Sequence, residues 1–284
     1  MSRNRRKKIR NRQQNPSDHR RVDLHMHSHL SDGTLAPRDI VELACKRKLD
    51  VICISDHDLA PVIEANEYHH HDHCVRVIHG AEMSVSFHGE EQHFLAYFPE
   101  QMPEDFRAHC THLSQARAHR YEELRKDLRL EGIPEADEQS KLGLRSLTRR
   151  HLARAVIEAG HARYISEVFE RWLKNKERED LFPSATEMIS TIKDHGGLCF
   201  WAHPALKKVI AHVAELKNLG IDGLEVFRPH LTKGDRKRLR QICVQNSLLC
   251  SGGSDSHDDS IGLFSFSAGE IHNWPQTFSF HSVN

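Results

Sequence analysis

Short apolar segments alternate with amphipathic segments along two stretches of the chain, residues 22–103 and 183–284, and this alternation constrains the fold more than any other feature. The expected strands lie at 22–27, 50–55, 75–79, 83–87, 92–98, 198–202, 223–227 and 248–251. Strands separated by helices are typical of an α/β protein with a mainly parallel sheet and right-handed crossovers. Six or seven such units predict a barrel rather than an open sheet.

The segment 104–182 between these stretches shows no convincing strand. Its apolar residues recur at helical spacing, for example Leu124 and Leu128. We therefore expect an α-helical insertion that covers the substrate. The barrel pattern resumes after it, where Ser184 and Glu187 have the spacing of a capping box at the start of a helix.

The formal net charge of zero conceals a basic N-terminus. Residues 1–21 contain nine Lys or Arg and a single acid, Asp18, and have almost no apolar side chain. Such a tail is expected to be disordered, either as a solvated leader or as a weak electrostatic contact for RNA. The remainder is acidic, which argues against a broad nucleic-acid-binding face.

Neither a membrane segment nor a secretory signal is expected. No apolar run approaches the about 20 residues of a membrane helix, and no apolar segment follows the basic tail. The seven cysteines form no CxxC pair, which fits reduced thiols. We therefore predict a cytoplasmic protein without a membrane partner.

Histidines and carboxylates follow nearly every expected strand. His25 and His27 lie on one face of the first strand, because side chains alternate along a strand. The others in chain order are Asp32, His57, Glu82, His93, His203, Asp255 and His257. Because active sites of βα barrels lie at the C-terminal ends of the strands, we predict that these side chains converge on a metal site.

Six motifs carry a resemblance to a known family. They are DLHMHSHLSDG, ISDHD, GAEMS, QHFLAYF, WAHP and SGGSDSH, in this order from residue 23 to residue 257. The chain resembles the PHP (polymerase and histidinol phosphatase) family, and within it the branch of nucleoside 3′,5′-bisphosphate phosphatases and RNase AM-like 5′-to-3′ exoribonucleases. The resemblance implies a distorted (β/α)7 barrel with a helical insertion domain, spanning 22–103 and 183–284 around the insertion at 104–182.

The resemblance also implies three divalent metal ions, with manganese expected and iron, magnesium or zinc as alternatives. Nine ligand positions are implied, and all hold competent residues. His25, His27, Glu82 and Asp255 would hold the first ion, Asp32, His57 and His203 the second, and Glu82, His93 and His257 the third. Closely spaced metals activate water and stabilise a phosphoryl group, which indicates phosphoester hydrolysis without a protein nucleophile.

Substrate contacts are predicted for arginines, whose guanidinium groups match phosphate oxygens. Arg117 and Arg149 lie in insertion segments that resemble the arginine-rich segments of the branch, and Arg228 follows the strand at 223–227. Asp58, beside His57, is the fourth predicted contact, and Asp58 and Asp56 are also expected to orient the metal ligands. For each arginine the alternative is a solvated or ion-paired side chain.

The predicted reaction is metal-dependent hydrolysis of the 3′-phosphoester of 5′-phosphorylated nucleotides. The substrates would be nucleoside 3′,5′-bisphosphates or short RNA or DNA oligonucleotides, cut from 5′ to 3′, with the 5′-phosphate held by Arg117 and Arg149. One alternative is a small-molecule phosphatase of the histidinol-phosphate type. The other is a PHP module that binds metal or nucleotide without turnover; the complete ligand set favours an enzyme.

Overall fold

The computed structural model describes residues 19–174, 179–271 and 273–278. The basic tail up to residue 18, and with it the predicted RNA contact, lies outside the described residues. The described chain forms two five-stranded sheets with the strand orders β10-β1-β2-β4-β3 and β5-β6-β7-β8-β9. In this part of the chain, no helix combines the length and apolar character needed to cross a membrane.

The first sheet contains β1 (Arg21–Asp23), β2 (Val51–Ile52), β3 (Glu67–His70), β4 (His73–Val77) and β10 (Phe266–Ser267). Its central strands are parallel, and β10 and β3 are antiparallel edges. The expected strands at 22–27 and 50–55 end early, because the polar residues after them turn into the site. The sequence did not predict β3, an edge strand whose outward residues are polar and break the apolar alternation.

The second sheet contains β5 (His79–Phe87), β6 (Glu90–Phe98), β7 (Leu198–Trp201), β8 (Gly223–Phe227) and β9 (Leu249–Gly252). Strands β5, β6 and β7 are antiparallel, whereas β7, β8 and β9 are parallel. The expectation of a mainly parallel sheet is therefore wrong for this part. The reason is local: His88 and Gly89 both have positive φ, and they form a two-residue turn that joins β5 directly to β6.

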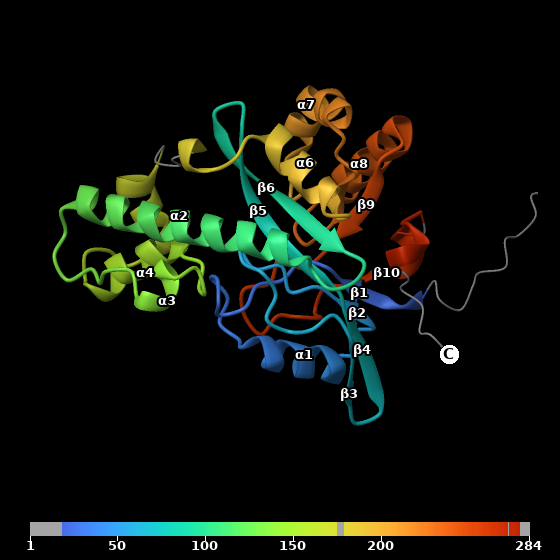
Figure 1. Ribbon diagram of the computed structural model, residues 1–284, viewed down its shortest axis with the longest axis horizontal. Helices are drawn as coiled ribbons and strands as arrows, with labels where there is room; N and C mark the ends of the chain where they lie inside the picture. Colours follow the sequence, from blue (N-terminus) through green and yellow to red (C-terminus); the bar gives the residue numbers. More distant parts are fainter. Residues whose placement is uncertain (1–18, 175–178, 272, 279–284) are drawn as a thin grey trace, which may run out of the picture.

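Helices cover the sheets on opposite sides. Figure 1 shows α6 (Ala185–Asp194), α7 (Leu206–Leu219) and α8 (Lys233–Asn246) on one side and α1 (Pro37–Lys46) on the other. The capping box predicted at Ser184 and Glu187 is present at the start of α6. The main core lies between the second sheet and its helices and includes Phe94, Phe200 and Ile189. Short 3₁₀ turns occupy Ala268–Ile271 and Gln276–Phe278.

Two isolated bridges connect the sheets, one between Met26 and Ser256 and one between His57 and Glu82. These bridges bring the segments that follow β1, β2 and β9 next to β5. The α/β fold predicted from the sequence is confirmed, in a distorted form built from two mixed sheets rather than a regular barrel.

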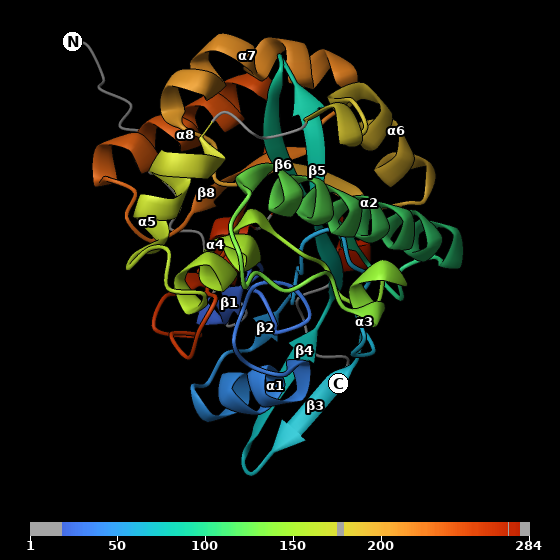
Figure 2. The ribbon, with the colours of Figure 1, turned by 90° about the vertical axis from the view of Figure 1, so that its left-hand side faces the viewer.

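The described residues of the insertion, 104–174 and 179–182, are mainly helical, and many of them share a core separate from the main one. The elements are α2 (Glu104–Leu128), α3 (Glu138–Lys141), α4 (Arg149–Glu158), α5 (Ile165–Val168), a π-helical turn at Phe169–Leu173 and a 3₁₀ turn at Glu179–Leu181. Leu124 and Leu128 of α2 pack with Leu152 and Val156 of α4. Figure 2 shows this segment in front of the strands, on the side where the sheets meet.

Candidate active site

The nine predicted ligands lie in one group, which we call the histidine–carboxylate cluster: His25, His27, Asp32, His57, Glu82, His93, His203, Asp255 and His257. Glu82 is its centre. The Glu82 carboxylate oxygens lie 2.8–3.3 Å from ring nitrogens of five histidines. Asp255 Oδ1 is 3.2 Å from His27 Nε2, and Asp32 Oδ1 is 3.2 Å from His257 Nε2.

Close backbone contacts bring the cluster together. A Cβ atom added to Gly253 would lie only 2.3 Å from His25 Cβ, so the loop after β9 reaches His25 only with glycine at this position. His203 and Asp255 both have positive φ, which non-glycine residues seldom adopt. Left-handed backbone of this kind is concentrated at functional sites, where the surrounding structure holds it.

The cluster has the donors that divalent cations require. Asp32 Oδ1, His57 Nδ1, Glu82 Oε2 and His93 Nδ1 are buried and make no hydrogen bond. A buried polar group without a partner is costly, and bound metal ions would satisfy all four. The residues therefore fit a metal centre of mixed nitrogen and oxygen ligands.

The donor atoms fall into groups that differ from the expected ones at two positions. His257 groups with His27, Asp32 and His57, within 4.8 Å. His203 Nε2 instead lies 2.8 Å from Glu82 Oε1, and its ring is 5.4 Å from the His93 ring. These distances place His257, rather than His203, beside Asp32, and His203, rather than His257, beside His93. The reason is strand order, since β7 pairs with β6, which carries His93, whereas Ser256 pairs with Met26 next to His27.

The carboxylates of the cluster are held ionised. Burial favours protonation of Glu82, but the surrounding histidines hold its pKa well below the usual value. Burial opposes the charged form of His27 and His93 too, yet neighbouring carboxylates raise their pKa to about 10 and about 9. Burial lowers the pKa of His57 well below 6.5. Without metal, protonated histidines thus balance the negative charge that a cation would otherwise neutralise.

Sequence reasoning missed Glu225, which is fully buried in β8. Its Oε1 atom lies 2.9 Å from His25 Nδ1, and its Oε2 atom accepts a 2.6 Å hydrogen bond from the His203 backbone N–H. A carboxylate on the second ring nitrogen fixes the orientation of a ligating histidine. The available signal was a glutamate within the otherwise apolar strand Gly223–Phe227.

Arg117 and Asp58 bind each other in the interior. Arg117 Nε donates to Asp58 Oδ2 at 2.5 Å, and Asp58 Oδ1 accepts from the Ser84 backbone N–H at 2.7 Å. Arg117 is 2% exposed and Asp58 is fully buried. This contact is the ion-paired alternative considered for Arg117, and it places Asp58 where it can orient the neighbouring His57, the other role expected for it.

The other two predicted arginines lie next to the cluster. Arg149, in the first turn of α4, is 22% exposed, and its Nη2 atom lies 3.4 Å from Glu91 Oε2. Glu91 Oε1 is in turn 3.5 Å from His93 Nε2. Arg228 Nη2 donates to the Pro204 carbonyl at 3.0 Å, directly after His203.

The α4 N-terminus meets the cluster itself. Thr148, the N-cap residue of α4, donates from Oγ1 to Asp32 Oδ2 at 3.2 Å. Helix N-termini favour anions, because their free N–H groups and the helix dipole attract negative charge. A basic residue and a helix N-terminus thus lie beside the cluster, on the inserted segment.

A buried group of histidines and carboxylates at strand ends, with arginine beside it, defines a metal-dependent hydrolase of phosphoesters. Residues 23–199 match the PHP domain family. This match spans most of the chain, so the protein belongs to the PHP domain family.

Similar proteins agree with this class. The 5′-3′ exoribonuclease Rnm of Salmonella typhimurium is 28% identical over 251 residues, which span 83% of this chain and 84% of that protein. The 3′,5′-nucleoside bisphosphate phosphatase of Chromobacterium violaceum is 22% identical over 252 residues, which span 85% and 88% of the two chains.

A solved structure supports the fold. A crystal structure from Bifidobacterium adolescentis, described as that of a proposed metal-dependent phosphoesterase, superposes with a TM-score of 0.67 at 23% identity. It covers 88% of this chain and 94% of the other. Together with the family and its named relatives, the site makes this protein a metal-dependent phosphoesterase.

Proposed function

We propose that this phosphoesterase hydrolyses the 3′-phosphoester of 5′-phosphorylated nucleotides. The observation that carries the proposal is Arg149, which lies at the α4 N-terminus and is connected through Glu91 to His93 of the cluster. This arrangement offers a site for a second phosphate beside the one that is cleaved. The two similar proteins act, by their names, on a nucleoside bisphosphate and on RNA from its 5′ end, and both substrates can carry that second phosphate.

The cluster would hold three divalent ions, with manganese as the proposed metal. His25, His27, Glu82 and Asp255 would bind one, Glu82, His93 and His203 another, and Asp32, His57 and His257 the remaining one. When bound, such ions polarise a phosphoryl group and lower the pKa of water. The protein's contribution is to fix the ligands: Glu225 orients His25, and Thr148 holds Asp32.

One geometry then serves two substrates. In both substrates, water attacks the phosphorus that is bonded to the 3′ oxygen. The bond between this phosphorus and the 3′ oxygen then breaks. A nucleoside 3′,5′-bisphosphate releases inorganic phosphate and a nucleoside 5′-phosphate. A 5′-phosphorylated oligonucleotide releases its first nucleotide, and the remaining chain keeps a new 5′-phosphate for the next cut.

The test compares adenosine 3′,5′-bisphosphate with adenosine 3′-phosphate, which lacks the 5′-phosphate. We expect Arg149→Ala to lower kcat/KM on the bisphosphate by roughly 10- to 150-fold, the effect of losing a charged hydrogen-bond donor. The value for adenosine 3′-phosphate should change by less than about twofold. Arg171→Ala is the matched control, since Arg171 lies in the same insertion but is exposed and pairs with Glu167.

Two results would contradict the proposal. Equal losses on both substrates would show that Arg149 does not bind the 5′-phosphate. Faster turnover of histidinol phosphate than of either nucleotide would place the enzyme among small-molecule phosphatases instead.

A further inference from the structure

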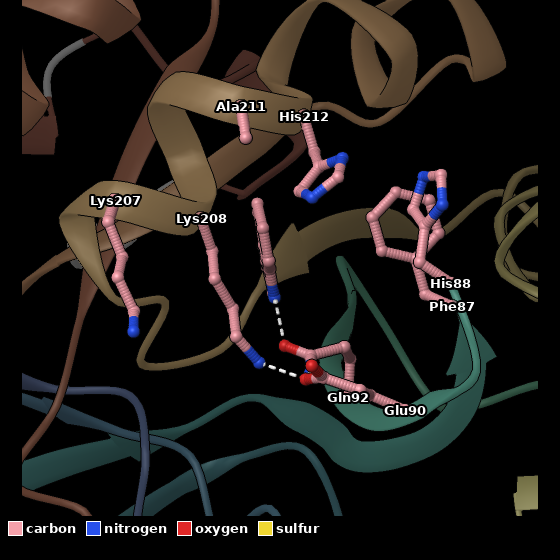
Figure 3. Close-up of a pocket in the computed structure, with 9 residues that line it drawn as sticks. Phe87, His88, Glu90, Gln92, Lys207, Lys208, Ala211 and His212 are labelled. Atoms are coloured by element: carbon pink, nitrogen blue, oxygen red, sulfur yellow. Dashed lines mark hydrogen bonds and ion pairs between the residues drawn. The ribbon is translucent and has the colours of Figure 1, made fainter.

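A cavity of about 290 Å³ lies between the tip of the β5–β6 hairpin and the first turns of α7 (Figure 3). Its lining residues include Phe87 and His88 from the hairpin, Trp201 from β7, and Lys207, Lys208 and His212 from α7. None of them belongs to the histidine–carboxylate cluster. The volume is close to the lower end of the range for small-molecule sites.

The cavity adjoins the cluster along two chain segments. Gln92 lines the cavity, and the next residue, His93, lies 3.0 Å from Glu82. Trp201 also lines it, and His203 follows two residues later in the cluster. Strand β7 pairs with β6 from Phe94 to Tyr97, so the start of β6, residues 90–93, extends past β7. Gln92 and His93 point to opposite faces of β6, because side chains alternate along a strand. A chain bound at the cluster would therefore reach the cavity around the start of β6, past His203.

The walls of the cavity are aromatic. The His88 and His212 rings lie 4.4 Å apart, and their side chains are 50% and 31% exposed. Phe87 packs against His212 at 5.4 Å between ring centres. His88 Nε2 lies 2.8 Å from Glu215 Oε2, which holds its ring in place. Rings arranged in this way offer surfaces on which a base can stack.

Two lysines of α7 line the cavity, and an arginine lies near the cluster. Lys207 is exposed, and Lys208, which follows it in the first turn of α7, forms an ion pair with Glu90. Figure 3 shows both lysines at the same side of the cavity. Arg228 lies beside Pro204, between His203 and the start of α7. Single-stranded nucleic acids are bound by this combination of cations that follow the backbone and aromatic surfaces that receive bases.

We propose that the cavity binds the base of a nucleotide on the 3′ side of the scissile phosphate in a single-stranded oligoribonucleotide, with Lys207 and Lys208 holding its phosphate. The proposal rests on the proposed function and extends it to a substrate longer than a bisphosphate. A nucleoside 3′,5′-bisphosphate has no nucleotide beyond its 3′-phosphate and leaves the cavity empty. Comparing activity on the two substrates therefore distinguishes an effect on the cavity from an effect on the cluster.

The experiment measures kcat/KM on adenosine 3′,5′-bisphosphate and on a 5′-phosphorylated pentaribonucleotide. For His212→Ala we expect a loss of roughly fivefold or more on the pentamer, as for removal of a stacking surface, and an unchanged value on the bisphosphate. For Lys207→Gln with Lys208→Gln, the slope of log KM against log salt on the pentamer should fall by about 0.7 for each lost phosphate contact. Lys217→Gln, in the last turn of α7 and outside the cavity, is the control.

The outcomes separate the two proposals. If the wild-type protein cleaves the bisphosphate but the cavity variants cleave the pentamer normally, the cavity does not bind RNA. The same conclusion follows if they lose activity equally on both substrates. If the wild-type protein cleaves neither substrate with added manganese, the proposed function itself is wrong.

Discussion

Replacing Arg117 by methionine tests whether this arginine stabilises the site or contacts the substrate. The structure predicts a loss of stability, because the change leaves the Asp58 carboxylate without its cation. Asp58 is fully buried and keeps only the Ser84 backbone N–H as a hydrogen-bond donor. Methionine preserves much of the packing volume, so the main change is electrostatic.

The magnitude follows from the burial of both partners. Removing one member of a buried ion pair costs about 3–5 kcal/mol, because an uncompensated charge stays in the interior. At about 2–3 °C for each kcal/mol in a protein of this size, Tm should fall by roughly 6–15 °C. The double variant Asp58→Asn with Arg117→Met should regain much of this loss, since no charge is then left unpaired.

The assay is thermal unfolding followed by circular dichroism, combined with kcat/KM below the unfolding temperature. We expect Arg117→Met to lose activity in similar proportion on adenosine 3′,5′-bisphosphate and on adenosine 3′-phosphate. An unchanged Tm, together with a selective loss on the 5′-phosphorylated substrate, would refute this reasoning. It would show that Arg117 binds the 5′-phosphate, as the sequence alone suggested.

Two further predictions concern Glu82 of the cluster and His151 of α4. Glu82→Gln keeps the shape of the side chain but removes the charge shared by five histidines, so metal content by elemental analysis and kcat should both fall. The loss should be roughly 100-fold or more in kcat, because even partners of metal ligands contribute 10- to 100-fold; full activity would exclude Glu82 as a ligand. His151 lies in the first turn of α4, next to Thr148. Burial lowers its pKa from 6.5 to about 4, so between these pH values the unfolded chain binds a proton that the folded chain excludes. His151 alone should therefore lower the stability by about 2 kcal/mol between pH 7 and pH 5. Urea unfolding of the wild-type protein and of His151→Gln at both pH values measures this share: relative to the wild-type protein, the variant should lose about 2 kcal/mol less.

The sequence was most informative where function depends on local geometry. The alternation of a strand places His25 and His27 on one face, whatever the rest of the chain does. The capping box at Ser184 and Glu187 depends on four consecutive residues, and it formed as predicted. The position of polar residues after strands also indicated that they would meet, because strand ends share one edge of the fold.

Only the tertiary structure decided which of these residues become neighbours. His203 lies with His93 because β7 pairs antiparallel with β6 across an insertion of about 80 residues, and no local pattern encodes that pairing. Arg117 of α2 is buried against Asp58 and also donates to Ser84 of β5, although Asp58 lies 59 residues away in the sequence. Charge and residue type are properties of the chain, but burial and partner choice arise from contacts between distant segments, and these contacts determine whether an arginine stabilises the site or faces the substrate.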